Sequence, residues 1–539
     1  MKHKKFLFMF VALITTFFMM FSLVGCNLLQ EDNSSTGGGS DSTINDDSND
    51  GKGDKSENDD NLPGDENGSE TEGENVNKPD DDAGEDNGGD DDNGDDGFKL
   101  PENGYDGSEV SITFANTMGR DYVSTLEDAI TRFNVLYPNI TVTIDNTIRS
   151  YDELFNRISM QILTNRQPNL AFCYPDHVAL YNQSGTVLAL DDFMPNGAFK
   201  DITVTNTIGT EIFGLTQEQA NDYVETFLAE GSVYGDGKMY TLPFAKATDV
   251  MYYNKTFFEK HSDILTEPTD NMSWEEVLDL CKLIKQIDSS CTPLGIDGDA
   301  NFFITLCNQY DSTYTSATGE HFLFDTPKNR EFMEMFRDWY DAGYFTTMEI
   351  LDMYTSSLFN MQKCYLSISS AASAVYYALD LYSQNSDYEV GIVSIPQANP
   401  LKPKSNTQGP SVCIFKKENL QEVCASWLLL KFLTTDAIFQ AQYSIASGYV
   451  PVIKSAYECD EYKAYLSSAN GYATGIAALA ASTSLRVCKE NAFFTIPAFV
   501  GSIKAREQVG LLFLAVIKEN KSIEQAFEDA VVLCKKYYN

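Results

Sequence analysis

The sequence predicts an α/β protein with two lobes, preceded by an acidic segment that does not fold. Beyond residue 104, strand-like and helix-like spacings of apolar residues alternate, which is typical of a parallel sheet. About 440 residues follow the acidic segment, more than one hydrophobic core usually holds. The acidic segment itself, residues 31–97, holds 25 Asp and Glu against three Lys and hardly any apolar side chains, so it cannot bury enough surface to fold.

The first folded segments read as a β-α-β unit. Apolar residues alternate over 110–114, repeat at helical spacing over 123–133, and alternate again over 140–144 after Pro138. The same logic then repeats, with a helix expected over 154–162 and a short apolar strand over 170–173.

Turn and capping residues place several later elements. The run Gly235-Asp236-Gly237-Lys238 tolerates positive φ and predicts a hairpin between strands at 232–234 and 239–242, with a further strand over 250–253. Three helix starts are marked by a capping box or by proline: Ser273 with Glu276, Pro327, and Ser522 with Gln525.

The N-terminal residues predict export. A basic start is followed by a nearly unbroken apolar run over residues 6–24, and Gly25 precedes Cys26. This order resembles the lipobox of bacterial lipoproteins, so we expect a signal peptide over 1–25, acylation of Cys26, and a disordered acidic linker over 26–104. The alternative is an uncleaved N-terminal helix with an incidental cysteine.

Charge and motif content argue against several function classes. The acidic tract contributes −22 of the net charge of −41, and the remaining chain is also acidic, so nucleic acid is an unsuitable partner. No nucleophile-elbow, zinc-protease, P-loop or dinucleotide motif follows the signal, so we expect no enzyme. The pair Asp191-Asp192 is a candidate for glycosidase carboxylates, but adjacent acids are more common where a helix begins.

Cysteine and histidine spacing predicts neither a metal site nor a cofactor. The ten cysteines after Cys26 are scattered with no C-x-x-C pair, and His177 and His321 have no ligand partners nearby in the sequence. Whether these cysteines pair as disulfides or remain free thiols is left open.

The order of several segments resembles the family 1 extracellular solute-binding proteins, which include the maltose-binding and glycerol-3-phosphate-binding proteins of ABC importers. The resemblance runs from about residue 111 to 535 and depends on order and spacing rather than on one motif. Its segments are 133–138 (FNVLYP), 184–192 (SGTVLALDD), 237–244 (GKMYTLPF), 252–255 (YYNK), 273–276 (SWEE), 369–370 (SS), 408–411 (QGPS) and 447–451 (SGYVP).

The resemblance implies a two-lobed, periplasmic-binding-protein-like fold with a hinge and an interlobe cleft. It predicts that the chain crosses between lobes near 245–250, 367–372 and 433–439. The domains expected from it are lobe 1 over 105–246 and 371–435, and lobe 2 over 247–370 and 436–539.

Two positions depart from the family pattern. Asn169 follows Pro168 where relatives usually carry an acid, which keeps capping ability but loses the charge. Residues 244–248 replace the hydroxyl-rich run of the glycerol-3-phosphate binders, with Thr248 as a substitute contact.

Candidate ligand residues follow from chemistry and from the family pattern. Tyr174 and Tyr449 offer aromatic faces for a sugar ring, and Asp176 beside Tyr174 can accept hydrogen bonds from hydroxyl groups. Ser369 and Ser370 follow an apolar strand, where their hydroxyl groups would emerge near the cleft. Each residue also has a structural alternative, as ordinary packing or as a helix cap.

Three further candidates come mainly from the resemblance. Gly409 permits close approach of the backbone to a ligand, although a plain turn glycine is equally natural. Arg506 aligns with a phosphate contact of the glycerol-3-phosphate binders, and its alternative is a pair with an acid. Lys246 lies at the first expected crossing and is a comparable candidate.

The resemblance implies an extracytoplasmic binding component of an ABC importer. The expected ligand is a mono- to oligosaccharide, and the expected partners are the solute, the permease subunits and, through Cys26, the membrane; a monomer is expected. One alternative in the same class is a binder of glycerol-3-phosphate or a glycerophosphodiester. The alternatives in other classes are a surface glycan-degrading enzyme and an adhesin.

Overall fold

The computed structural model describes residues 98–378, 388–490 and 492–538 and contains two five-stranded sheets. The sheet that contains β1 (Val110–Ala115), with the helices packed on it, is called the first lobe, and the sheet that contains β7 (Asp249–Asn254), with its helices, is called the second lobe. The predicted signal peptide, Cys26 and most of the expected linker lie outside the described residues. The predicted α/β class with two lobes is confirmed.

The sheet of the first lobe has the strand order β2-β1-β3-β12-β6. Its strands are β1 (Val110–Ala115), β2 (Ile140–Asp145), β3 (Leu170–Cys173), β6 (Leu242–Pro243) and β12 (Ser411–Ile414). β1 pairs in parallel with both β2 and β3, whereas β12 runs antiparallel to β3 and β6. The predicted β-α-β unit is confirmed, because a helix connects β1 to β2 and the two strands pair in parallel. Ile112 and Phe114 of the alternating run are buried in the core.

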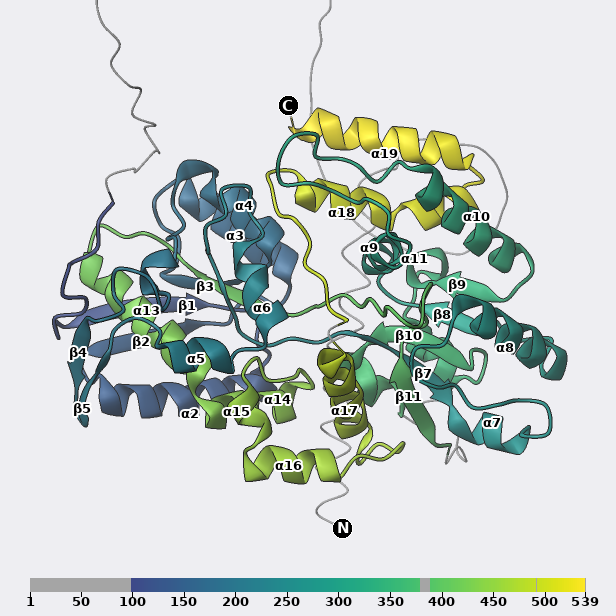
Figure 1. Ribbon diagram of the computed structural model, residues 1–539, viewed down its shortest axis with the longest axis horizontal. Coiled ribbons are helices and arrows are strands. Elements are labelled where there is room, and N and C mark those ends of the chain that lie inside the picture. The colour runs from purple at the N-terminus through teal and green to yellow at the C-terminus, as the bar shows by residue number, and fades with distance from the viewer. Residues whose placement is uncertain (1–97, 379–387, 491, 539) are drawn as a thin grey trace, which may run out of the picture. The chain divides into compact units, whose positions relative to one another are not determined.

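Helices cover both faces of this first sheet. Figure 1 shows α2 and α3 on opposite sides of it, as right-handed crossovers require when the chain moves outward to β2 and then back to β3. The helices and small strands of this lobe are α2 (Arg120–Leu136), α3 (Tyr151–Ile162), α4 (Pro175–Tyr181), β4 (Thr203–Asn206), β5 (Gly209–Ile212), α5 (Gln217–Asp222), α6 (Glu225–Ala229), α13 (Leu420–Thr435), α14 (Ala437–Ser447), α15 (Lys454–Tyr457) and α16 (Asp460–Ser467).

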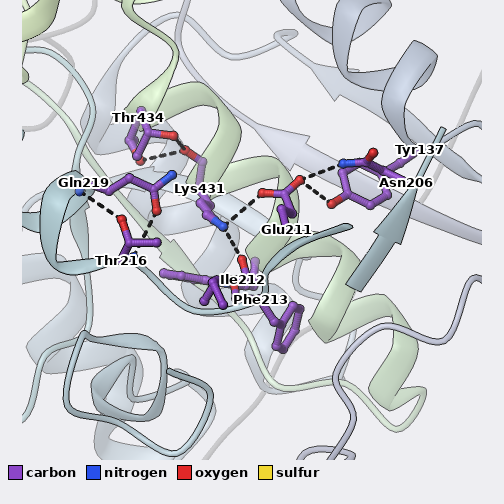
Figure 2. Close-up of polar contacts among 11 residues, drawn as sticks. Tyr137, Asn206, Glu211, Ile212, Phe213, Thr216, Gln219, Lys431 and Thr434 are labelled. Carbon is purple, nitrogen blue, oxygen red and sulfur yellow. Dashed lines mark hydrogen bonds and ion pairs between the residues drawn. The ribbon is translucent and has the colours of Figure 1, made fainter. Parts of the chain in front are cut away.

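An ion pair with a buried lysine connects α13 to the β4–β5 hairpin. Lys431, whose side chain is 4% exposed, lies 3.0 Å from Glu211 and donates to the carbonyl of Ile212 (Figure 2). Glu211 also accepts hydrogen bonds from Tyr137 at 2.6 Å and Asn206 at 3.0 Å. Because Lys431 and Glu211 each have more than one partner, the network can hold the buried ammonium group beside a carboxylate that is 34% exposed.

The sheet of the second lobe has the strand order β11-β7-β10-β8-β9. Its strands are β7 (Asp249–Asn254), β8 (Leu294–Ile296), β9 (Phe345–Thr347), β10 (Leu366–Ser370) and β11 (Val390–Ser394). β10, β8 and β9 are parallel, and β7 runs antiparallel between β10 and β11. The start of β7 and the ends of the parallel strands therefore meet at one edge.

Predicted caps start the main helices of the second lobe. The capping box of Ser273 with Glu276 opens α8, and Pro327 is the first residue of α10, as predicted. The helices here are α7 (Lys255–Lys260), α8 (Trp274–Ile287), α9 (Asp299–Gln309), α10 (Pro327–Asp341), α11 (Met348–Leu351), α12 (Thr355–Asn360), α17 (Ile476–Lys489), α18 (Ser502–Gly510) and α19 (Ile523–Tyr538).

The chain passes between the sheets at points that differ partly from expectation. It leaves the first sheet between β6 and β7, as expected for 245–250, and returns between β11 and β12. The crossing expected at 367–372 is wrong, since β10 leads into a 3-10 helix and then into β11 of the same sheet. The crossing expected at 433–439 is also wrong, because α13 and α14 both pack in the core of the first lobe.

The predicted hairpin around Gly235 is not formed. Gly237 does adopt a positive φ of 69°, so the turn chemistry is right. However, Tyr234 bridges to Ala498, and Leu242 pairs with Val412 of β12. The two flanking segments keep one backbone hydrogen bond, from Tyr240 to the carbonyl of Gly231, but their strand pairing is with partners that are distant in the sequence.

Candidate functional site

The predicted ligand residues gather at corresponding edges of the two sheets. In the first sheet, Tyr174 and Asp176 follow the carboxyl end of β3, and Gly409 precedes β12 at the same edge. In the second sheet, Ser369 and Ser370 end β10 opposite the start of β7. The carboxyl edge of such a sheet is where α/β proteins usually bind ligands.

A cluster of tyrosines lies at the edge of the first lobe. The rings of Tyr151 and Tyr174 have centroids 4.8 Å apart. Burial raises the pKa of Tyr449, and its hydrogen bond with Tyr151 acts in the opposite direction. The structure thus brings the two predicted aromatic platforms together through Tyr151, which was missed although it follows the helix cap Ser150.

Gly409 is needed by the protein itself rather than only by a ligand. Its φ is +104°, and an added Cβ would lie 2.4 Å from the carbonyl oxygen of Ala245 and 2.9 Å from Cε1 of Tyr449. The glycine therefore lets the returning chain pack against the outgoing crossing and under the Tyr449 ring.

Lys246 is fully buried in a polar network. Its ammonium group contacts the carboxylate of Glu230 and donates to the carbonyl of Gly409 and to Oγ of Ser411, each at 3.2 Å. Ser411 donates in turn to Glu230 at 3.2 Å. Lys246 thus has its charge matched inside the protein, and Glu230 is a partner that sequence reasoning missed.

The edge of the second lobe carries two carboxyl groups, those of the buried Asp249 and the half-buried Asp297. Burial raises the pKa of Asp249 to about 7, although Gln408 donates to this side chain at 2.5 Å. Burial also raises the pKa of Asp297, against hydrogen bonds from Thr355 and Ser369. These two acids were not predicted, because a single Asp at a strand end carries no distinctive spacing.

The predicted hydroxyl residues of this region have different roles. Ser369 faces Asp297, as a hydroxyl near a ligand site would. Ser370 caps the following 3-10 helix by accepting from the N–H of Ala372 at 3.3 Å, and Thr248 donates to the carbonyl of Asn406 at 2.8 Å. In this structure, Ser370 and Thr248 therefore support the backbone.

A buried hydroxyl group with no partner in the described part of the chain lies close to Asp249. A cavity of about 10 Å³, room for about one water molecule, is lined by Asp249, Asp297 and Thr305 together with apolar side chains. The Thr305 hydroxyl is buried and has no hydrogen-bond partner among the described residues. Buried groups of this kind usually have a partner such as water or a ligand.

Further tyrosines extend the aromatic surface toward the second lobe. Burial raises the pKa of Tyr376 to about 12, and Tyr122 of α2 and Tyr354 add to the shift. Tyr354 also interacts with Asp297. Aromatic rings therefore accompany the carboxyl groups, an association that the abundance of 29 Tyr concealed in the sequence.

Two predicted ligand residues bind each other. Nε of Arg506 on α18 lies 3.2 Å from Oδ2 of Asp176 on α4, and Nη1 donates to Asn301 at 2.6 Å. The alternative that Arg506 pairs with an acid is what the structure contains, and the pair joins the two lobes.

A second hollow, of about 430 Å³, lies between α3 and the first sheet. It contains none of the predicted ligand residues. Two of the three cations that line it have internal partners, since Arg157 pairs with Asp145 at 2.5 Å and Lys417 contacts the carbonyl of Gln167. We therefore place the candidate site at the strand edges.

The described residues contain no metal-binding cluster, no membrane-spanning helix and no disulfide. No group of three or more His, Cys, Asp or Glu gathers there as a metal site would require, and no helix among them is long and apolar enough to cross a membrane. The ten cysteines after Cys26, all within this part, are free thiols. Asp191 and Asp192 lie in the first turn of a 3-10 helix, as adjacent acids often do, and Asp191 accepts from the N–H of Met239 at 3.1 Å rather than capping that helix.

Comparison with known proteins gives a consistent result. A family described as bacterial extracellular solute-binding proteins matches residues 128–468. A protein of Brucella abortus (strain 2308), named only as a binding protein, is 23% identical over 368 residues, which cover 66% of this chain and 79% of the relative.

Solved structures share the fold. UgpB from Mycobacterium tuberculosis in complex with glycerophosphocholine aligns with a TM-score of 0.63 at 17% identity, over 79% of this chain and 98% of that one. The sugar-binding protein MalE from Xanthomonas citri aligns with a TM-score of 0.61 at 14% identity, over 79% and 97%. These identities establish a shared two-lobed architecture and leave the ligand to be argued from the residues.

Proposed function

The chain belongs to the bacterial extracellular solute-binding proteins, and we propose that it delivers a neutral carbohydrate, of one to several sugar units, to an ABC importer. The observation that carries the proposal is the pairing of tyrosine rings with carboxyl groups at the two sheet edges. Tyr151, Tyr174 and Tyr449 offer faces to the C–H-rich side of a sugar ring. Asp249 and Asp297 offer acceptors to its hydroxyl groups.

Charge at the site favours a neutral ligand over a phosphate ester. The cations Lys246 and Arg506 are each matched by an acid, Glu230 and Asp176. The carboxyl groups of Asp249 and Asp297 have no cationic partner among the contacts of the described residues. A phosphate would have to displace an internal ion pair, which costs more than binding a neutral hydroxyl group.

The alternatives from other classes have less support. Asp191, the acid nominated from the sequence for a glycosidase, is held in a backbone turn. The carboxyl groups of Asp249 and Asp297 accept hydrogen bonds from Gln408 and from the N–H of Thr355, so each already has a partner in the protein. An adhesin built as a β-sandwich would not carry helices on both faces of its sheets.

The proposed setting follows the family and the N-terminal sequence. The protein acts outside the cytoplasm, its acylated Cys26 holds it at the membrane, and the acidic segment serves as a spacer. In this proposal a monomer captures solute between the lobes, and the permease subunits are its macromolecular partners. The resulting hinge closure excludes water from the ligand's hydrogen bonds.

Thermal-shift screening followed by calorimetry tests the proposal. The protein without residues 1–25 and with Cys26→Ala is screened against neutral sugars, oligosaccharides, polyols, glycerol 3-phosphate and glycerophosphodiesters. A selective stabilisation by a neutral sugar is expected, because a ligand that binds only the native state raises its melting temperature. Selective binding of a phosphate ester would overturn the neutral-ligand proposal, and turnover of a glycan would indicate an enzyme.

A further inference from the structure

The ion pair between Asp176 and Arg506 joins elements that are far apart in the chain. Asp176 lies in the first turn of α4, directly after the central strand β3 of the first lobe. Arg506 lies on α18 of the second lobe, and Asn301 of the neighbouring helix α9 holds its Nη1 at 2.6 Å. One guanidinium group is thus held by both lobes.

Both ends of this contact stand on rigid supports. On the first lobe, Val178 and Tyr181 of α4 are buried in the core. On the second lobe, α18 packs so closely on α9 that a Cβ added at Gly510 would lie 3.3 Å from Cβ of Ala300. Neither helix can shift alone to keep the contact, so the 3.2 Å separation requires one particular relation between the lobes.

Because it is partly buried, this ion pair contributes more stabilising free energy than an ordinary surface pair does. The side chain of Asp176 is 11% exposed and that of Arg506 is 35% exposed. Burial opposes the guanidinium charge, whereas the neighbouring Asp176 and Tyr314 favour it and keep the pKa of Arg506 above its usual value. If the lobes separated, both charges would return to water, so the pair is stabilising only while the lobes are together.

We propose that Asp176, Arg506 and Asn301 form an interlobe clasp, which in the absence of ligand holds the lobes in the arrangement of this structure, here called closed. The clasp is a property of the protein alone; only its effect on affinity rests on the proposed binding function. A ligand that needs the closed arrangement binds in proportion to the fraction already closed, so the clasp raises affinity without any contact to the ligand.

Exchanging the charges of Asp176 and Arg506 distinguishes a clasp between the lobes from a pair of ligand contacts. If both residues contact a ligand, swapping them destroys the site. If they act as a clasp, Asp176→Arg combined with Arg506→Asp recreates the pair, and the Asn301 amide can turn to donate to the new carboxylate. Single and double variants therefore separate the two roles.

Pulsed electron spin resonance on the ligand-free protein measures the clasp directly. Spin-labelled amino acids replace Met160 of α3 and Val532 of α19, which are 65% and 64% exposed, so the native thiols stay unlabelled. We expect Asp176→Asn and Arg506→Gln each to reduce the short-distance population about threefold or more, and the double swap to restore it. Asp279→Asn, which breaks an exposed pair with Lys282 inside the second lobe, is the matched control and should change nothing.

Each result has a defined meaning. Unchanged distances in both single variants would overturn the clasp, as would a double swap that stays as open as the singles. A restored closed population with lost sugar binding would support the clasp and assign the same residues a ligand contact as well. Because the measurement needs no ligand, failure to find a sugar would leave this result standing and would count only against the proposed function.

Discussion

The first edge, where β3 of the first lobe ends, and the second edge, where β10 of the second lobe ends, differ in the charge of their buried polar groups. At the first edge, charges are kept and matched, as in Lys246 with Glu230, and burial lowers the pKa of the nearby His177 to about 4. At the second edge, burial raises the pKa of Asp249 and of Asp299 to about 7. One physical cause, the cost of burying a charge, thus holds a histidine neutral in one lobe and favours neutral acids in the other.

The difference indicates how a neutral solute would be divided between the lobes. The first edge offers aromatic faces, and its cations are already occupied. The second edge offers carboxyl oxygens that change protonation near neutral pH. A sugar would therefore rest its ring on the first lobe and direct hydroxyl groups to the second.

The largest expected effect comes from removing the matched charge of the first edge. Lys246→Met leaves Glu230, whose side chain is only 13% exposed, without its cation. Breaking one side of a buried pair costs about 3 to 5 kcal/mol, so the free energy of unfolding in urea should fall by about that amount. The double variant Lys246→Met with Glu230→Leu should recover part of the loss, because no unpaired charge remains.

An exposed lysine provides the control for this prediction. Lys200 is 54% exposed and lies 3.9 Å from Asp201, so Lys200→Met should stay within about 0.5 kcal/mol of the wild type. A loss below about 1 kcal/mol for Lys246→Met would show that the two edges do not differ in the way described.

The sequence predicted the elements better than their partners. The alternation at Ile112 and Phe114 and the capping box at Ser273 are local signals, and they were confirmed. The crossing expected after Ser369 was wrong because an apolar strand carries no mark of which sheet it joins. The same holds for the turn at Gly237, whose flanking segments pair elsewhere.

For the site, too, the sequence predicted individual residues better than the partners that they contact. Tyr174 was predicted from its place after a strand and Tyr449 from its place in the turn over 447–451, and the structure puts both beside Tyr151. The partners of Lys246 and Arg506 were not predictable, since Glu230 lies 16 positions away and Asp176 lies 330 positions away. Ion pairing across such separations depends on the assembled fold.

Titration of the two edges gives the next prediction. The raised pKa of Asp249 means that between about pH 4 and 7 the native group keeps a proton that the unfolded group has lost. Its stabilising contribution is therefore full below pH 4 and is lost as pH rises through 7, by about 1.4 kcal/mol per pH unit. In urea unfolding, the wild type should lose stability relative to Asp249→Asn as pH rises across this range.

His177 should show the opposite sign. Its lowered pKa means that between about pH 6.5 and 4 the unfolded residue gains a proton that the native one refuses. Stability linked to His177 is present above pH 6.5 and is lost as pH falls toward 4, so the wild type should lose stability relative to His177→Phe on acidification. Parallel pH profiles for the two variants would contradict the contrast between the lobes.

The smallest expected effect concerns the aromatic surface, and it rests on the proposed function. Tyr449→Ala removes a ring that lies against Gly409 beside Tyr151, and affinity for a sugar ligand should fall about tenfold, or ~1.4 kcal/mol, in calorimetry. Tyr472→Ala, at a site 48% exposed, is the control and should bind as the wild type does. If Tyr449→Ala also binds unchanged while Asp249→Asn loses affinity, the second edge alone recognises the solute, and the tyrosines of the first edge serve packing.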